Sequence, residues 1–282
     1  AGVVETLGPG VDSVEPGDPV VVNPSLSCGA CEWCLRGEQS LCVRFRIIGE
    51  HTQGGFAEFV AVPAANLYPI PTGFDFDRAA AAPLAFLTSW RGLITRGRLR
   101  PGESALITGA SGGTGSAAVQ IAKLAGAHVF AVTTAENVDR VRALGADVVY
   151  DRMTVDYSRE VWRDTGKRGV DVIFDSVGEA TWQGNVRAAA RGGRIVVYGA
   201  TTGHDAAIDM RQLFWKQLEI LGTTMSNRAE FRTVMDLIIA GRLDPVIDVV
   251  WPLDQASAAH ERLEAGRQFG KIVLRPGPAD RS

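Results

Sequence analysis

The chain has 282 residues, 46% of them hydrophobic, which is enough for one large domain or two ordinary domains with buried cores. Its net charge is −3 and neither lysine nor arginine forms a run of five, which argues against nucleic-acid and anionic-membrane partners. The longest apolar stretch, residues 79–90, contains Pro83 and is shorter than a membrane span of about 20 residues. A small-molecule substrate is therefore expected, with no nucleic acid and no membrane.

The first 75 residues show short apolar runs separated by turn sequences. The runs are VVET, PVVVNP and FAEFVAVP, and the turns are GPG, EPGD and QGG. Short apolar runs between glycine-rich and proline-rich turns are typical of a small all-β unit. The opening AGVVETLGPG has no initiator methionine, basic region or long apolar region, so we do not expect a signal peptide.

All four cysteines of the chain lie within residues 28–42 of this unit. Cys28, Cys31, Cys34 and Cys42 have the spacing C-x2-C-x2-C-x7-C. Four thiolates this close together can surround one tetrahedral zinc ion, which leaves no coordination position for a substrate. Two disulfides are the alternative, although the tight spacing suits disulfide geometry poorly. The pattern predicts one structural zinc ion, and reduced cysteines indicate a cytoplasmic protein.

From about residue 79 the pattern changes to alanine-rich helical stretches that alternate with short β-branched runs. Such alternation predicts a parallel, doubly wound sheet. The expected strands are 104–109, 127–133, 170–177 and 193–199, with helices at 114–125 and 136–144. Near the end of the chain, residues 252–267 predict a capped helix and residues 269–276 a final strand.

A glycine-rich turn follows the first of these strands. Ala110, Gly112 and Gly115 occupy the G-x-G-x-x-G frame, with Gly113 and Thr114 between them. A strand leads in, a helix leads out and a second strand follows, which is the βαβ setting that places a pyrophosphate at a helix N-terminus. The alternative is a tight turn that serves only helix packing.

The end of the second strand bears on which dinucleotide fits. An acidic residue there would hold the ribose 2′-hydroxyl of NAD, but the sequence continues as AVTTAEN. Thr133, Thr134 and, further on, Arg140 offer hydroxyls and a cation to a 2′-phosphate, so NADP is the expected cofactor, with NAD possible. Glu136 is either a phosphate-repelling acid or an ordinary acid of the first helical turn, and the second interpretation is preferred.

Two further strand ends belong to the predicted ligand edge of the sheet. Residues 175–178, which include Val177, end the strand VDVIFDSV, and Gly199 ends the neighbouring one. Ligands of doubly wound folds bind at the carboxyl ends of the strands, so these backbones should flank a ribose of the cofactor. Ordinary strand-end turns would explain the same residues.

Together, the four-cysteine loop, GASGGTG, GGRIVVYG and FGKIVL resemble the medium-chain dehydrogenase/reductase family. The segments PLAFLTSW and LEILGTTM are similar to its quinone-oxidoreductase and zinc-binding alcohol-dehydrogenase-like branch. The resemblance implies an α/β fold in which a GroES-like catalytic domain, residues 1–80 and 252–282 with a zinc lobe at 28–42, is interrupted by a Rossmann domain at 81–251. It also implies that substrate and nicotinamide meet between the domains, and that the protein is a homodimer.

The resemblance suggests roles for three more residues. Thr88 matches a threonine that faces the nicotinamide in relatives, and Lys271 is expected to approach the cofactor. His51, near the expected substrate cleft, could donate a proton or hydrogen bond to a carbonyl oxygen. Thr88 could instead bond its own helix backbone, and His51 could be an ordinary loop residue.

Two departures from the family pattern affect the predicted chemistry. In relatives a segment that supplies a strand, part of the substrate pocket and, in the zinc enzymes, two catalytic zinc ligands precedes AGVVETLGPG, so the sequence is predicted to be a fragment, which by itself can be inactive. The third catalytic ligand should lie at or near Leu84, which cannot bind zinc, and no Cys, His, Asp or Glu occurs between Asp77 and Glu103.

The sequence therefore predicts an NAD(P)H-dependent oxidoreductase that reduces quinones or activated C=C bonds by hydride transfer, without a catalytic zinc ion. A zinc-dependent alcohol dehydrogenase is the alternative among enzymes. A non-catalytic dinucleotide-binding domain is the alternative from another class.

Overall fold

The computed structural model describes residues 1–277, which form two compact units. The first contains residues 1–87 and the chain from residue 225 onward; the second contains residues 88–224. The expected domain limits, 80/81 and 251/252, differ from this division mainly at residues 225–251. Within that stretch, Asp236 accepts a hydrogen bond from the Tyr68 hydroxyl, which ties it to the first unit.

A parallel sheet of six strands, counted within residues 1–277, forms the centre of the second unit. Its order is β11-β10-β9-β6-β7-β8. The strands are β6 (Ser104–Ile107), β7 (His128–Thr133), β8 (Val148–Asp151), β9 (Val170–Asp175), β10 (Ala189–Val197) and β11 (Glu219–Gly222). In register, Leu106 lies between Phe130 and Ile173. The doubly wound parallel sheet predicted from the sequence is confirmed, and β8 and β11 are strands that the sequence did not predict.

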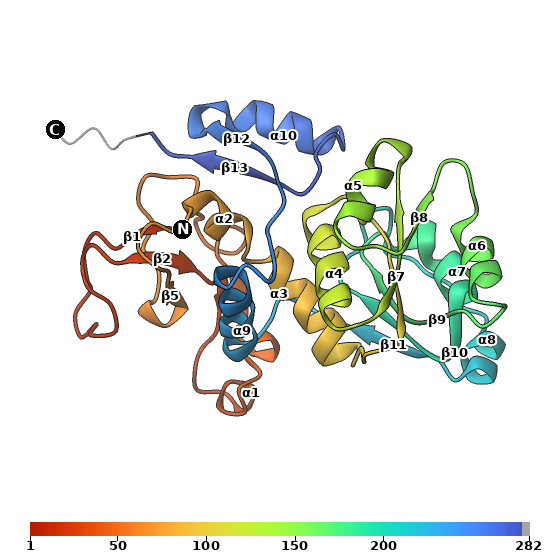
Figure 1. Ribbon diagram of the computed structural model, residues 1–282. Coiled ribbons are helices and arrows are strands. Elements are labelled where there is room, and N and C mark those ends of the chain that lie inside the picture. The colour runs from red at the N-terminus through yellow and green to blue at the C-terminus, as the bar shows by residue number, and fades with distance from the viewer. Residues whose placement is uncertain (278–282) are drawn as a thin grey trace. The chain divides into compact units, whose positions relative to one another are not determined.

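Helices lie on both faces of this sheet, shown yellow to cyan in Figure 1. They are α4 (Gly113–Leu124), η4 (Ala135–Asn137), α5 (Val138–Ala143), α6 (Tyr157–Asp164), α7 (Glu179–Ala188) and α8 (Met210–Lys216). Leu106, Ile173 and Ile195 pack with Val161 of α6 and Trp182 of α7 in one buried cluster. Because side chains alternate along a strand, their neighbours face the opposite layer.

That opposite layer includes the π-helix η3 (Arg91–Arg96), which directly follows α3 (Ala85–Trp90). A Cβ on Gly92 would lie 2.2 Å from a ring atom of Phe174. Only glycine therefore lets η3 approach the aromatic ring of β9 so closely.

The first unit has shorter elements. Its strands are β1 (Gly2–Val3), β2 (Pro19–Val22), β3 (Ser25–Leu26), β4 (Arg46–Ile47), β5 (Leu67–Pro69), β12 (Ile247–Pro252) and β13 (Lys271–Arg275). They form an antiparallel sheet β1-β2-β5, an antiparallel pair β3-β4 and a parallel pair β12-β13. Its helices are α1 (Glu32–Leu35), η1 (Gln39–Leu41), η2 (Ala64–Asn66), α2 (Phe76–Ala81), α9 (Arg228–Ile239), η5 (Leu253–Gln255) and α10 (Ala256–Glu264).

One expected strand is wrong. Residues 56–63, FAEFVAVP, form no strand in the part of the chain that is described, and Phe56 and Phe59 are more than 60% exposed. The apolar pattern suits a strand, but a strand forms only where another backbone accepts its hydrogen bonds, and the ladder of the β1-β2-β5 sheet does not include this segment. By contrast, the predicted late helix and final strand are present as α10 and β13.

Candidate functional site

The turn between β6 and α4 brings the predicted dinucleotide-binding residues together. The Ala110 amide donates a hydrogen bond to the Val132 carbonyl of β7 (3.1 Å), and Gly109 has a φ of +60°. A Cβ on Gly115 would lie 2.1 Å from the Gly109 carbonyl oxygen, so glycine is needed for α4 to start this close to β6. A Cβ on Gly112 would meet that oxygen at an ordinary 3.5 Å, so packing inside the protein does not require this glycine.

The N-terminus of α4 is suited to an anion. This helix has twelve residues, and no side chain caps its first turn. The first N–H groups of a helix have no partner inside it, and the helix dipole favours negative charge there. The Ser89 hydroxyl donates to the Thr114 carbonyl (2.8 Å), which anchors the turn to α3, a contact that the sequence did not predict. A helix N-terminus beside close-packed glycines fits the pyrophosphate of a nicotinamide dinucleotide.

The end of β7 differs from the site expected for a 2′-phosphate. The Thr133 hydroxyl is buried and has no hydrogen-bond partner. The Thr134 hydroxyl donates to a carboxylate oxygen of Glu136 (2.6 Å), and this bond lowers the pKa of the Glu136 carboxyl. Arg140 is exposed on α5. In this arrangement neither the Thr133 hydroxyl nor the Thr134 hydroxyl points its hydrogen at a 2′-phosphate, which is the role that the sequence suggested for both.

The ends of β6 and β9 are joined around a buried carboxylate, Asp175. Its oxygens accept hydrogen bonds from the hydroxyls of Thr108 (2.6 Å) and Thr181 (2.8 Å) and from the Gly178 amide (3.0 Å). Thr108 and Thr181 were missed in the sequence because each lies far from Asp175 along the chain or in a different element. In the sequence, Thr108 is recognisable only as a hydroxyl residue just after a strand. Thr181 is recognisable only as a hydroxyl residue in the first turn of a helix.

Val177 and Gly199 lie at this same edge. The Val177 carbonyl accepts from the amide and hydroxyl of Thr202 (2.9 and 2.7 Å). A Cβ on Gly199 would lie 3.0 Å from the Ser176 Cβ. All the dinucleotide-binding residues predicted within the second unit therefore lie at the carboxyl ends of its parallel strands or just beyond them, where doubly wound folds bind ligands. Their individual contacts with a cofactor stay predictions.

The other predicted site residues have defined surroundings. His51 accepts a hydrogen bond at Nδ1 from the Ile47 amide (3.1 Å), so neutral His51 carries its hydrogen on Nε2 and can donate it. Thr88 is buried on α3, and burial lowers the pKa of Lys271 on β13. The catalytic roles of Thr88 and His51 and the cofactor contact of Lys271 stay predictions.

The four cysteines form one cluster in the first unit. They are free thiols whose sulfur atoms all lie within 4.8 Å of one another. The sulfur of Cys34 lies 3.6 Å from that of Cys31 and 3.9 Å from that of Cys28, near the separation of about 3.8 Å that tetrahedral zinc–sulfur bonds require. The disulfide alternative is not observed.

Backbone amides prepare this cluster for a cation. Amides of Cys34 and Val43 lower the pKa of the Cys31 thiol to about 6, whereas burial raises the pKa of the Cys34 thiol to about 11. The Cys31 amide donates to the Cys28 sulfur, and the amides of Cys28 and Arg44 to the Cys42 sulfur (each 3.3 Å). The donor set fits a zinc ion with a complete shell of sulfur ligands.

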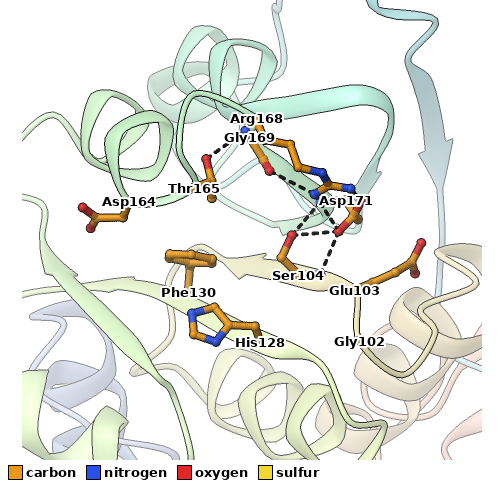
Figure 2. Close-up of a pocket in the computed structure, with 10 residues that line it drawn as sticks. All are labelled: Gly102, Glu103, Ser104, His128, Phe130, Asp164, Thr165, Arg168, Gly169 and Asp171. Atoms are coloured by element: carbon orange, nitrogen blue, oxygen red, sulfur yellow. Dashed lines mark hydrogen bonds and ion pairs between the residues drawn. The ribbon is translucent and has the colours of Figure 1, made fainter.

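A pocket of about 510 Å³ lies at the opposite end of the sheet, where β6, β7 and β9 begin (Figure 2). The Asp171 carboxylate accepts hydrogen bonds from Ser104 and Arg168. Asp164 accepts from the Tyr150 hydroxyl, and Glu103 pairs with Arg194. These carboxylates are satisfied by neighbouring side chains, so we attribute the pocket to the shape of the fold and not to ligand binding.

No helix within residues 1–277 is long and apolar enough to cross a membrane.

Two family models match parts of the chain. Residues 1–72 match the family model described as alcohol dehydrogenase GroES-like domain, and residues 113–240 match that described as zinc-binding dehydrogenase. The predicted GroES-like unit is thereby confirmed.

Two curated relatives cover nearly the whole chain. It is 34% identical over 284 residues to an NAD-dependent alcohol dehydrogenase of Sulfolobus acidocaldarius, covering 98% of the chain and 80% of the relative. It is 32% identical over 308 residues to a crotonyl-CoA reductase of Streptomyces avermitilis, covering 98% and 67%. Among solved structures, an NAD-dependent alcohol dehydrogenase has a TM-score of 0.94 at 44% identity, covering 98% of this chain and 81% of that one.

Proposed function

Since the chain belongs to the medium-chain dehydrogenase/reductase family, we propose that it reduces an activated C=C bond with hydride from a reduced nicotinamide dinucleotide, without a zinc ion at the substrate. The coarser assignment, an NAD(P)-dependent oxidoreductase, follows from the family itself and from relatives named as dehydrogenases and reductases.

Leu84 is the observation that supports reduction without zinc. By resemblance it lies where the zinc-dependent enzymes place a catalytic ligand, and its side chain has no lone pair to donate. Leu84 is exposed and has a φ of +66°, and the Ala85 amide donates to the Pro83 carbonyl across it (2.8 Å). No Cys, His, Asp or Glu lies between residues 78 and 102 that could replace it.

A conjugated alkene suits such a site because its own carbonyl draws electrons from the double bond. A bound reduced nicotinamide would supply the hydride, which would add to the alkene carbon remote from the carbonyl. The electron pair of the double bond moves toward the carbonyl oxygen, and a proton then adds to the adjacent carbon. The protein needs chiefly to orient the two reactants and to donate a hydrogen bond to the developing enolate oxygen.

His51 and Thr88 are the proposed groups at this step. The Ile47 amide holds His51 in the tautomer that presents an Nε2–H donor. Thr88 would line the site of hydride transfer, as its resemblance implies. His51→Ala tests the first assignment: we expect at least a tenfold lower kcat if the imidazole donates to the enolate, and unchanged turnover would remove His51 from the mechanism.

The relative named crotonyl-CoA reductase supports an unsaturated thioester as the acceptor class. A quinone is the other acceptor predicted from the sequence, but the names of these relatives give it no support. The relatives named alcohol dehydrogenase support a second candidate, a zinc-dependent alcohol dehydrogenase.

One experiment separates these functions. The full-length protein is purified, analysed for zinc per chain and assayed with an enoyl thioester, a quinone and a primary alcohol, before and after chelation. We expect one zinc per chain and alkene reduction that persists when the exchangeable metal is removed. Two zinc ions per chain, with chelator-sensitive alcohol oxidation, would support the alcohol dehydrogenase instead. Nucleotide binding without any turnover would support a non-catalytic domain.

Gly112→Ala tests the dinucleotide site separately from the substrate. Because its Cβ would contact the protein at an ordinary 3.5 Å, the fold should tolerate the methyl group. A pyrophosphate that approaches this backbone should not, so we expect at least tenfold weaker nucleotide binding with little change in stability. Unchanged binding would place the pyrophosphate elsewhere.

We propose that the zinc ion held by the four cysteines is structural, because their sulfurs complete its shell. Reduced cysteines also support the predicted cytoplasmic location.

The predicted homodimer is supported by an exposed apolar edge of the second unit. Within residues 1–277, β11 pairs with β10 alone, so its outer backbone groups can pair with the same strand of a second copy. Met210, Phe214, Trp215 and Ile220 are exposed on or beside it. Light scattering should show a dimer that Phe214→Glu with Ile220→Lys converts to a monomer. Met153→Glu, at an exposed residue just after β8 on the opposite edge, should leave it dimeric.

A further inference from the structure

The cysteine segment, residues 28–42, contacts the start of α9 through one side chain. The Arg228 amide, which is the first N–H group of α9, donates a hydrogen bond to the side-chain oxygen of Gln39 (3.2 Å). A capping box formed by Asn227 and Glu230 satisfies two other amides at this helix end but does not include the Arg228 amide. Gln39 therefore completes the cap of α9 from a distant part of the chain.

The position of Gln39 depends on the cysteines at either side of it. Cys34 lies five residues before Gln39, and the Cys42 amide, three residues after it, donates to the Gln39 carbonyl (3.0 Å). Leu35 and Leu41 are 77% and 48% exposed, so burial of apolar surface does little to hold the segment. An ion bound by the sulfurs of Cys34 and Cys42 would therefore fix Gln39 from both sides.

The chain just before α9 contains a strained residue. Met225 is the first residue of the stretch that returns to the first unit, and its φ of +47° is left-handed, which is unfavourable for a residue with a side chain. Met225 and Ser226 are both buried. A strained backbone persists only where the surrounding contacts hold it. Loss of the Gln39 hydrogen bond should therefore let residues 225–230 relax.

We propose that the four-cysteine zinc site holds residues 225–230 in place through Gln39, so that loss of the ion releases the start of α9. This inference rests on the proposed structural zinc ion. The coupling has three steps: the ion orders the cysteine segment, the ordered segment presents the Gln39 oxygen to the Arg228 amide, and the completed cap holds Met225 in its left-handed conformation. The zinc ion would then act on a part of the chain that supplies none of its ligands.

Hydrogen exchange, measured by mass spectrometry on the full-length protein, tests this coupling. Peptides that cover residues 225–231 are compared before and after a chelator removes the zinc ion. We expect their amides to exchange about tenfold faster without zinc, which is about the factor that one net hydrogen bond contributes. Peptides that cover α6 of the second unit should exchange at the same rate in both samples. Unchanged exchange over residues 225–231 would overturn the coupling.

Variants of Gln39 separate the effect of its side chain from that of the ion. Gln39→Leu removes the acceptor at nearly the same size, so it should speed exchange over residues 225–231 while the zinc content stays at one per chain. Gln39→Glu keeps an acceptor oxygen at the helix N-terminus and should keep the slow exchange. Gln53→Leu, at an exposed glutamine of the first unit, is the matched control. Slow exchange in zinc-loaded Gln39→Leu, or equal acceleration by both leucine variants, would overturn the role of Gln39.

The outcomes also separate this inference from the proposals on which it rests. Zinc removal without any change over residues 225–231 would overturn the coupling and leave the structural zinc site intact. Full-length protein that binds no zinc would overturn both. Turnover with an enoyl thioester is measured separately and tests the reaction alone.

Discussion

The two compact units of this chain hold their functional groups by different means. In the second unit, a parallel ladder buries one strand against the next, and the residues predicted to bind a dinucleotide follow strand ends. In the first unit, β1, β3 and β4 have two residues each, and the cysteine cluster lies in a segment whose regular structure is the short helices α1 and η1. Strand pairing positions the predicted dinucleotide site, whereas the predicted zinc site depends on the four cysteine side chains.

This difference predicts which kind of change should disrupt the site in each unit. A site on a ladder depends on close packing and on buried hydrogen bonds, so small changes in volume should damage it. A segment held by ligands depends on its ion, because without the ion few apolar contacts remain to order it. Substitutions in each unit can test this contrast.

The largest effect is expected at Cys34. Cys34→Ser removes a buried sulfur, and we expect zinc content to fall from one per chain to nearly none, with loss of structure over residues 28–42. Structural zinc contributes on the order of 10 kcal/mol in small zinc domains. Elemental analysis and limited proteolysis measure both effects. Leu35→Ser, at an exposed residue of the same helix, is the control, and retained zinc in Cys34→Ser would contradict a four-cysteine site.

Gly115→Ala should damage the second unit without removing zinc. Its methyl group would lie 2.1 Å from the Gly109 carbonyl oxygen, so α4 must move away from β6. We expect a loss of about 3 kcal/mol in the free energy of unfolding. For Gly112→Ala, measured in parallel by urea unfolding, we expect the loss in the free energy of unfolding to be under about 1 kcal/mol. Equal losses in the two variants would mean that the contact at Gly115 does not limit packing.

Asp175→Asn tests the buried hydrogen bonds at the carboxyl edge. An amide can accept from Thr108 and Thr181, but its NH2 group would then face the Gly178 amide. We expect unfolding to become easier by about 2 kcal/mol, because one buried donor loses its partner. Asp205→Asn is a control at an exposed carboxylate of the same unit. A change no larger than that of the control would show that Asp175 does not hold the strand ends.

The smallest effect is expected at the amino edge, on acidification. Burial opposes ionisation of Asp171, but Arg168 and Ser104 outweigh it and lower the pKa of this carboxyl. Its stabilising contribution is present above the ordinary aspartate pKa of about 4 and is lost as pH falls through the lower folded value. Asp171→Asn should therefore cost about 1 kcal/mol at pH 7 and make unfolding less dependent on pH below 4. Urea unfolding at several pH values measures this, and an unchanged acid dependence would contradict it.

Much of both sites was determined by short-range sequence. The cysteine spacing predicted a cluster within fifteen residues, and GASGGTG between two strands predicted the turn from β6 to α4. Such patterns succeed because their residues are joined by a few backbone turns, so spacing alone limits the geometry.

Only the tertiary structure decided the rest. It showed that residues 56–63 have no strand partner, that Thr108 donates to Asp175 across 67 residues of sequence, and that Thr134 is bonded to Glu136. The sequence by itself determined the family resemblance, the cysteine cluster and the edge of the sheet where a dinucleotide should bind. Which donors and acceptors face that edge depended on hydrogen bonds between side chains, and sequence spacing does not specify the directions of those bonds.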